Sequence, residues 1–143
     1  MAYKEWKREY NVSVKKFNDD HKKLFSYLNE LHRGLVSGLN IADMGYILHG
    51  LVDYTISHFK NEERLMLKHD FPEYDKHKQE HDDLLEEVSA FYKEFQAGKQ
   101  SFSLELLSFL DDWVTNHILT TDMKYKSFFE KIAKRQREER ESQ

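Results

Sequence analysis

The stretch FNDDHKKLFSYLNELHRGL, residues 17–35, places mostly large apolar side chains at alternating steps of four and three positions. Residues spaced in this way lie on one face of an α-helix, because the helix completes a turn about every 3.6 residues. The same alternation recurs over residues 44–65 and 74–95. The chain is therefore predicted to form several helices that bury similar apolar faces. The first face consists of Phe17, His21, Leu24, Leu28, Leu31 and Leu35.

Residues suited to helix ends separate these faces. Glycine can end a helix with a positive φ, serine and asparagine can cap the start of the next one, and proline fits the first helical turn. The residues in question are Gly38 and Gly98, Asn40 and Ser101 or Ser103, and Pro72. The predicted helices span roughly 18–37, 41–69, 72–97 and 103–135. Joined by short connections, they predict an all-α protein, an up-down-up-down four-helix bundle with an N-terminal arm.

The composition limits the class of protein. A length of 143 residues predicts a single domain, 1–143, divided into an arm at 1–17, the helical bundle at 18–135 and a charged tail at 136–143. The last ten residues, KRQREERESQ, are expected to form a solvated helix end rather than a surface for a partner.

Charge and residue usage exclude several functions. A net charge of -4 argues against a nucleic-acid partner. The absence of cysteine excludes disulfides, thiolate metal sites and cysteine nucleophiles. No apolar run is long enough to span a membrane, so a cytoplasmic protein without a membrane partner is predicted.

Five polar residues lie in line with the apolar residues of the first three helices. Burying an imidazole or carboxylate without a partner costs several kcal/mol, so each of these side chains needs one. A single buried histidine is more often a satisfied core residue than a metal ligand. Five such residues on three facing helices are harder to explain by packing alone. They are His21, His58, Glu62, His77 and His81.

The fourth helix changes its periodicity in the middle. Its apolar face leads to His117, whereas a second face, displaced by one residue, begins near Asp122. This step of five residues rotates by about 140° beyond a full turn in an ideal α-helix. Either a π-type bulge absorbs the step, or the two side chains reach a common site from different sides.

Together these residues form a set of five histidines and two carboxylates. That number exceeds the ligands of one tetrahedral zinc and suits two six-coordinate first-row metal ions bridged by carboxylates, with iron a good partner for imidazole. The candidate metal ligands are His21, His58, Glu62, His77, His81, His117 and Asp122.

Three other kinds of metal site fit the sequence less well than a site for two metal ions. Residues 77–81, HKQEH, match the H-x-x-E-H pattern of inverted zinc peptidases, but Glu80 lies off the helix face that carries His77 and His81. A ferritin-type oxidase would use Glu-x-x-His pairs, which the sequence lacks. Haem held by two histidines would leave three histidines and two acids unexplained.

Four short segments resemble the hemerythrin family, in particular its single-domain bacterial members. They are FNDDH at 17–21, HFKNEE at 58–63, HKQEH at 77–81 and WVTNHILTTD at 113–122, in the family's order. Trp6 and Tyr10 also resemble the family's aromatic N-terminal arm. The resemblance covers roughly residues 3–130.

The resemblance implies a cofactor of two iron ions with a bridging oxo or hydroxo group. His77, His81 and His117 would bind one iron, His21 and His58 the other, and both carboxylates would bridge them. One iron would keep a vacant position for dioxygen, beside an apolar pocket. The expected pocket residues are Leu24, Phe59, Trp113, Val114 and Ile118.

The function implied is reversible dioxygen binding for storage or delivery, without enzymatic turnover. The alternatives are an oxygen or redox sensor that acts through a separate partner, and a di-iron enzyme acting on peroxide or nitric oxide. Dioxygen is the expected partner, and the sequence identifies no protein partner.

Overall fold

The computed structural model describes residues 3–12, 14–98, 104–117 and 122–142, and every regular element in those ranges is helical. This confirms the all-α prediction. A short 3₁₀ turn, η1 at Arg8–Tyr10, precedes the longer helices. These are α1 at Lys15–Ser37, α2 at Ile41–Lys68, α3 at Tyr74–Gln96, α4 at Leu104–Asn116 and α5 at Met123–Glu141.

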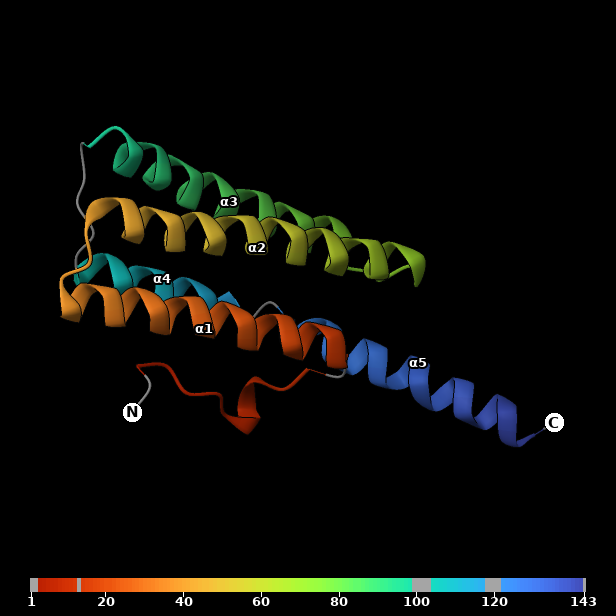
Figure 1. Cartoon of the computed structure of the whole chain (residues 1–143). Helices are drawn as coiled ribbons and strands as arrows, with labels where there is room; N and C mark the ends of the chain where they lie inside the picture. The colour runs from red at the N-terminus through yellow and green to blue at the C-terminus, as the bar shows by residue number, and fades with distance from the viewer. Residues whose placement is uncertain (1–2, 13, 99–103, 118–121, 143) are drawn as a thin grey trace.

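The helices form an antiparallel bundle (Figure 1). Helix α1 packs against α2 and α4, and α2 packs against α3. Helix α5 follows the direction of α4 and extends beyond the end of the bundle (Figure 1). The fourth predicted helix therefore consists of α4 and α5 together.

Most of the predicted helix ends agree with the structure. The Asn40 side chain accepts a hydrogen bond from the backbone N–H of Asp43 at 2.8 Å and so caps α2. Gly38 and Gly98 have φ values of 74° and 73°, as expected for residues that end a helix. The predicted caps Ser101 and Ser103 lie outside the described residues.

Pro72 was expected in the first turn of the third helix. This expectation is wrong, because α3 begins two residues later, at Tyr74. The backbone N–H of Tyr74 donates to the carbonyl of Phe71 at 3.1 Å, which closes a four-residue turn with Pro72 in its second position. The fixed φ of proline suits that position as well as it suits a helical turn. The sequence alone does not distinguish a proline in such a turn from a proline in the first turn of a helix.

The N-terminal arm is attached to α1 by paired hydrogen bonds. Asn18 accepts from the backbone N–H of Val12 and donates to its carbonyl, both at 2.7 Å. Asn29 makes the same pair of contacts with Lys4, at 2.6 and 2.9 Å. Helix α1 begins at Lys15 rather than at residue 18, so the arm is shorter than expected.

The charged end of the chain is helical. Helix α5 continues to Glu141, past the expected end of the bundle at residue 135. The side chains from Lys134 to Ser142 are exposed to solvent. Solvated lysine, arginine and glutamate can sustain a helix without packing, through pairs of opposite charge one turn apart.

The buried residues form two apolar clusters with a polar layer between them. The larger cluster occupies most of the bundle and includes Leu28, Leu51 and Leu110. The smaller one includes Phe17 and Met66. Each of α1, α2 and α3 passes from one cluster to the other through the segment that carries its candidate metal ligands. The fold thereby places these polar residues in one layer, closed by apolar side chains on both sides.

Candidate metal centre

The structure brings all seven candidate metal ligands together. Each of them is buried, with exposed fractions from 0% to 8%. They form two groups, and within each group one nitrogen or oxygen atom from every residue lies within 4.8 Å of the others. One group is Glu62, His77, His81, His117 and Asp122, and the other is His21, His58, Glu62 and Asp122.

Asp122 belongs to both groups, and each of its oxygens faces a different one. Oδ1 lies 3.3 Å from Nε2 of His77 and 3.0 Å from Nε2 of His117. Oδ2 lies 3.0 Å from Nε2 of His21. A carboxylate in this orientation can place one oxygen on each of two neighbouring cations.

Glu62 connects the same two groups from the opposite helix. Its Oε1 lies 3.1 Å from Nε2 of His58 and 3.3 Å from Nε2 of His81. Adjacent ligands of an octahedral ion with bonds of about 2.1 Å stand roughly 3 Å apart, so these separations suit donors that share a cation.

Several of these buried atoms make no hydrogen bond within the described part of the chain, although they approach one another closely. They include both oxygens of Glu62 and Asp122 and Nε2 of His21, His58 and His77. In addition, the Nε2 atoms of His81 and His117 stand 3.2 Å apart, where two unprotonated nitrogens would repel. Buried polar groups normally have partners. The chemistry of this donor set, imidazole and carboxylate together, fits first-row metal ions.

The electrostatics of the layer favour positive charge. Burial alone lowers the pKa of His58, but Glu62 and Asp20 raise it overall to about 10. Burial likewise lowers the pKa of His81, but Glu62 and Glu63 raise it overall to about 9. Although burial disfavours an ionised Asp122, His117 and the neighbouring imidazoles hold its pKa well below the usual range. The two carboxylates therefore remain charged and attract either protons on the imidazoles or metal ions.

Two further acids, neither of them predicted from the sequence, orient two of the histidines. Asp20 Oδ2 accepts a hydrogen bond from Nδ1 of His58 at 2.8 Å, and Glu63 Oε2 accepts one from Nδ1 of His81 at 2.8 Å. A proton held on Nδ1 leaves the lone pair on Nε2, directed into the centre. Both acids adjoin a candidate ligand in the sequence, but each serves a histidine on another helix.

A small apolar cavity lies next to the centre. Its volume is about 10 Å³, which leaves room for one very small molecule. Four of the five expected pocket residues line it, and the sequence analysis missed Leu84. Ile118, the fifth, lies outside the described residues. The described lining is His21, Leu24, His58, Phe59, Leu84, Trp113, Val114 and His117.

The step of five residues between His117 and Asp122 coincides with an irregular helix. The backbone at both residues is π-helical, whereas α4 and α5 on either side are α-helical. This supports the expected π-type bulge. Glu80, the residue that a zinc peptidase would need, belongs to neither ligand group.

The fold and this buried layer define a helical-bundle protein with a candidate site for metal ions. The family model described as the hemerythrin HHE cation binding domain matches residues 12–129. The bacteriohemerythrin of Methylococcus capsulatus is 35% identical over 126 residues, covering 87% of this chain and 95% of that protein. The hemerythrin-like protein of Naegleria gruberi is 30% identical and covers 85% of this chain and 89% of its own length.

Solved structures agree with these relatives. The crystal structure of wild-type hemerythrin superposes with a TM-score of 0.83 at 34% identity, covering 88% of this chain and 97% of that one. The chain belongs to the hemerythrin family. No helix in the described part of the chain is long and apolar enough to cross a membrane.

Proposed function

We propose that this protein binds dioxygen reversibly at a centre of two iron ions, for storage or delivery of oxygen. The observation that carries this proposal is the pair of buried donor groups that share Glu62 and Asp122 beside a small apolar cavity. Membership of the hemerythrin family supports the same assignment.

In this proposal the three histidines of the larger group, His77, His81 and His117, hold one iron. His21 and His58 hold the other, and the two shared carboxylates bridge the pair together with an oxo or hydroxo group. When bound, the two irons would supply the electrons that reversible dioxygen binding requires.

The chain's own residues account for a vacant position on one side. One group has three histidines and the other has two, so the two-histidine side is one protein ligand short. The cavity touches both histidines of that side, His21 and His58, and one of the three on the other side, His117. Dioxygen would therefore meet the less saturated ion.

The walls of the cavity exclude water and protons. Phe59 lies flat against the His81 ring, with centroids 3.7 Å apart and an interplanar angle of 3°. Leu24 and Val114 add aliphatic surface. None of the described side chains around the cavity is a carboxylic acid or a hydroxyl, and its three histidines are all candidate metal ligands, so no described wall residue outside the ligand set offers an acidic proton donor. This favours a binding protein over an enzyme.

A sensor remains the second candidate, because one observation favours it. Asp122, a shared candidate ligand, immediately precedes α5, and α5 extends beyond the bundle (Figure 1). A change at the centre could thus be transmitted to an exposed helix. The partner that would respond is not identified, and a cytoplasmic location stays a prediction from the sequence.

The test is a visible spectrum of the iron-loaded, reduced protein under nitrogen, then in air, then after oxygen is removed. We expect about two irons per chain and an absorption band that appears in air and disappears on deoxygenation. A fully loaded protein with one metal per chain would contradict the di-iron centre. A band that forms but does not reverse would contradict the carrier function.

A further inference from the structure

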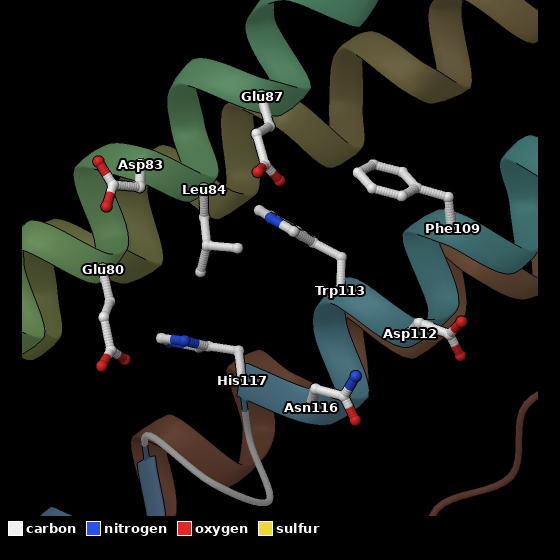
Figure 2. A pocket seen from close by; sticks show the side chains of 9 residues that line it. All are labelled: Glu80, Asp83, Leu84, Glu87, Phe109, Asp112, Trp113, Asn116 and His117. Carbon is white, nitrogen blue, oxygen red and sulfur yellow. The ribbon is translucent and has the colours of Figure 1, made fainter.

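A second, larger hollow lies outside the centre, between α3 and α4. Its volume is about 400 Å³, and it is open to solvent. In Figure 2, Glu80 and Glu87 extend from α3 toward His117, which directly follows α4, and Trp113 on α4. We call this hollow the α3–α4 groove. Its described lining is Glu80, Asp83, Leu84, Glu87, Phe109, Asp112, Trp113, Asn116 and His117.

The groove is strongly negative. Four of its nine described lining residues are carboxylates, and none is lysine or arginine. Asp83 accepts a hydrogen bond from the neutral amide of Gln79 at 2.9 Å, which leaves its charge in place. No ion pair within the described ranges neutralises Asp83, Glu87 or Asp112. A hollow lined by one sign of charge attracts ions of the opposite sign and raises their local concentration.

The groove adjoins the buried centre directly. Leu84, Trp113 and His117 line both the groove and the small cavity beside the candidate ligands, so they form the wall between the two. His117 is also the most exposed of the five candidate ligand histidines, at 8%, compared with 3% for His77 and 0–1% for the others.

Two buried polar atoms in this wall have no hydrogen-bond partner within the described chain. They are Nδ1 of His117 and Nε1 of Trp113, in side chains that are each 8% exposed. In Figure 2 the nitrogen-bearing edge of Trp113 is directed toward Glu87, across the groove. Buried polar atoms are rarely left without partners. Trp113 Nε1 can only donate, and so can His117 Nδ1 when Nε2 faces the centre, so a water oxygen carried by a hydrated cation in the groove would satisfy them.

The other approach to the centre is less favourable for a cation. Beside His77, the surface is lined by Glu73, Lys76, Glu80 and Lys124 and has essentially no room for a water molecule (about 0 Å³). Two amino groups would repel an incoming cation there. Charge and space therefore both distinguish the α3–α4 groove from the His77 side.

We propose that the α3–α4 groove is the entry site for the divalent first-row cations, ferrous ion foremost, that fill the centre; this rests on the proposed metal-binding function. The carboxylates of Asp83 and Glu87 concentrate hydrated cations at the rim. His117 is the first candidate ligand that a cation reaches. Passage inward requires only that the wall formed by Leu84 and Trp113 open locally, because the centre lies immediately behind it.

The proposal predicts the rate of metal uptake separately from the final amount bound. Metal-free protein is mixed anaerobically with ferrous ammonium sulfate at low ionic strength, and the unbound iron is measured over time with a chromogenic chelator. The double variant Asp83→Asn with Glu87→Gln removes two charges from the groove and no candidate ligand. We expect uptake to slow roughly three- to tenfold, with the final stoichiometry unchanged.

The matched control is Glu86→Gln with Glu94→Gln, which removes the same charge from exposed positions of α3 outside the groove. This variant should take up iron at nearly the wild-type rate. The difference between the two variants should also disappear at about 1 M salt, where charges are screened within about 3 Å.

The outcomes separate the two proposals. Equal rates in the groove variant, the control and the wild type would overturn the entry site while leaving the di-iron centre intact. An equal slowing in both double variants would also overturn it, because net charge alone would then explain the effect. Failure of the wild-type chain to bind two irons at equilibrium would overturn the proposed function, and the entry site with it.

Discussion

Asp20 on α1 and His58 on α2 are joined by a 2.8 Å hydrogen bond, although 38 positions separate them in the sequence. The second oxygen of Asp20 is held at 2.8 Å by Lys16 and by the hydroxyl of Tyr54. These contacts fix the carboxylate, which in turn fixes the ring orientation of His58. A residue outside the ligand set thereby controls the direction in which a candidate ligand presents its lone pair.

Replacing Asp20 by Asn should weaken metal binding without removing a ligand. We expect a loss of roughly 10–100-fold in affinity, because a carboxylate that accepts from Nδ1 both orients the imidazole and increases its basicity. A competition titration against a chelator of known affinity measures the effect. Asp19→Asn is the control, since Asp19 is exposed and, in the described part of the chain, its ion pair is with Lys15. Equal affinities for both variants would show that the Asp20 contact does not tune the site.

His81 and Glu80 are neighbours in the sequence that should respond differently to substitution. His81→Ala should lower the metal content and cost about 1–3 kcal/mol of stability, because it removes a buried partner of both Glu62 and Glu63. Glu80→Gln should leave two metals bound and the unfolding free energy nearly unchanged. Metal analysis and urea unfolding check both expectations. Loss of metal in the Glu80 variant would require that residue to be added to the centre.

The metal-free and metal-loaded proteins should depend on pH in different ways. In the metal-free protein the pKa values of His58 and His81 are raised from 6.5 to about 10 and about 9. Their contribution to stability is therefore complete below pH 6.5 and is lost as the pH rises through 9 and 10. In the loaded protein the ligating imidazoles carry no proton on Nε2, so stability should rise as the pH increases toward 6.5, where the unfolded histidines lose their protons, and stay nearly level from there to pH 10.

Urea unfolding at several pH values between 6 and 10 measures both slopes. Metal-free Glu62→Gln is the control, because Glu62 supplies the largest favourable charge interaction for His58. The unfolding free energy of this variant should fall less with rising pH than that of the metal-free wild type. A metal-free stability that rises between pH 6.5 and 9 would show that these histidines are not protonated in the folded chain.

The apolar cavity should protect the oxygenated protein. Val114→Thr keeps the β-branched shape but introduces a hydroxyl beside the centre, which can attract water or donate a proton. We expect the oxygenated form to convert about tenfold faster to the oxidised form. A tenfold increase in rate requires the activation barrier to fall by only about 1.4 kcal/mol. Val88→Thr is the control, because Val88 is also buried in the larger cluster but does not line the cavity. Similar decay rates for both would mean that Val114 is ordinary core.

Much of this structure could be predicted from local sequence alone. The helical period determines which side chains share a face, so the steps from His58 to Glu62 and from His77 to His81 place each pair toward the core. Asn40, Gly38 and Gly98 stand at helix ends because their local hydrogen bonding and φ preferences require no tertiary contact. For the step of five before Asp122 the sequence left two interpretations open, and the π-helical backbone at His117 and Asp122 supports the bulge.

Only the tertiary structure decided how those faces meet. The contacts of Asp20 with His58, of Glu63 with His81 and of Asp122 with three histidines join different segments of the chain. They depend on the rotation and axial offset of each helix, which packing of the whole core sets. The period of a single helix specifies the buried face but not its neighbour across the bundle. For the same reason the α3–α4 groove, formed by residues from two helices, has no signature in either helix alone.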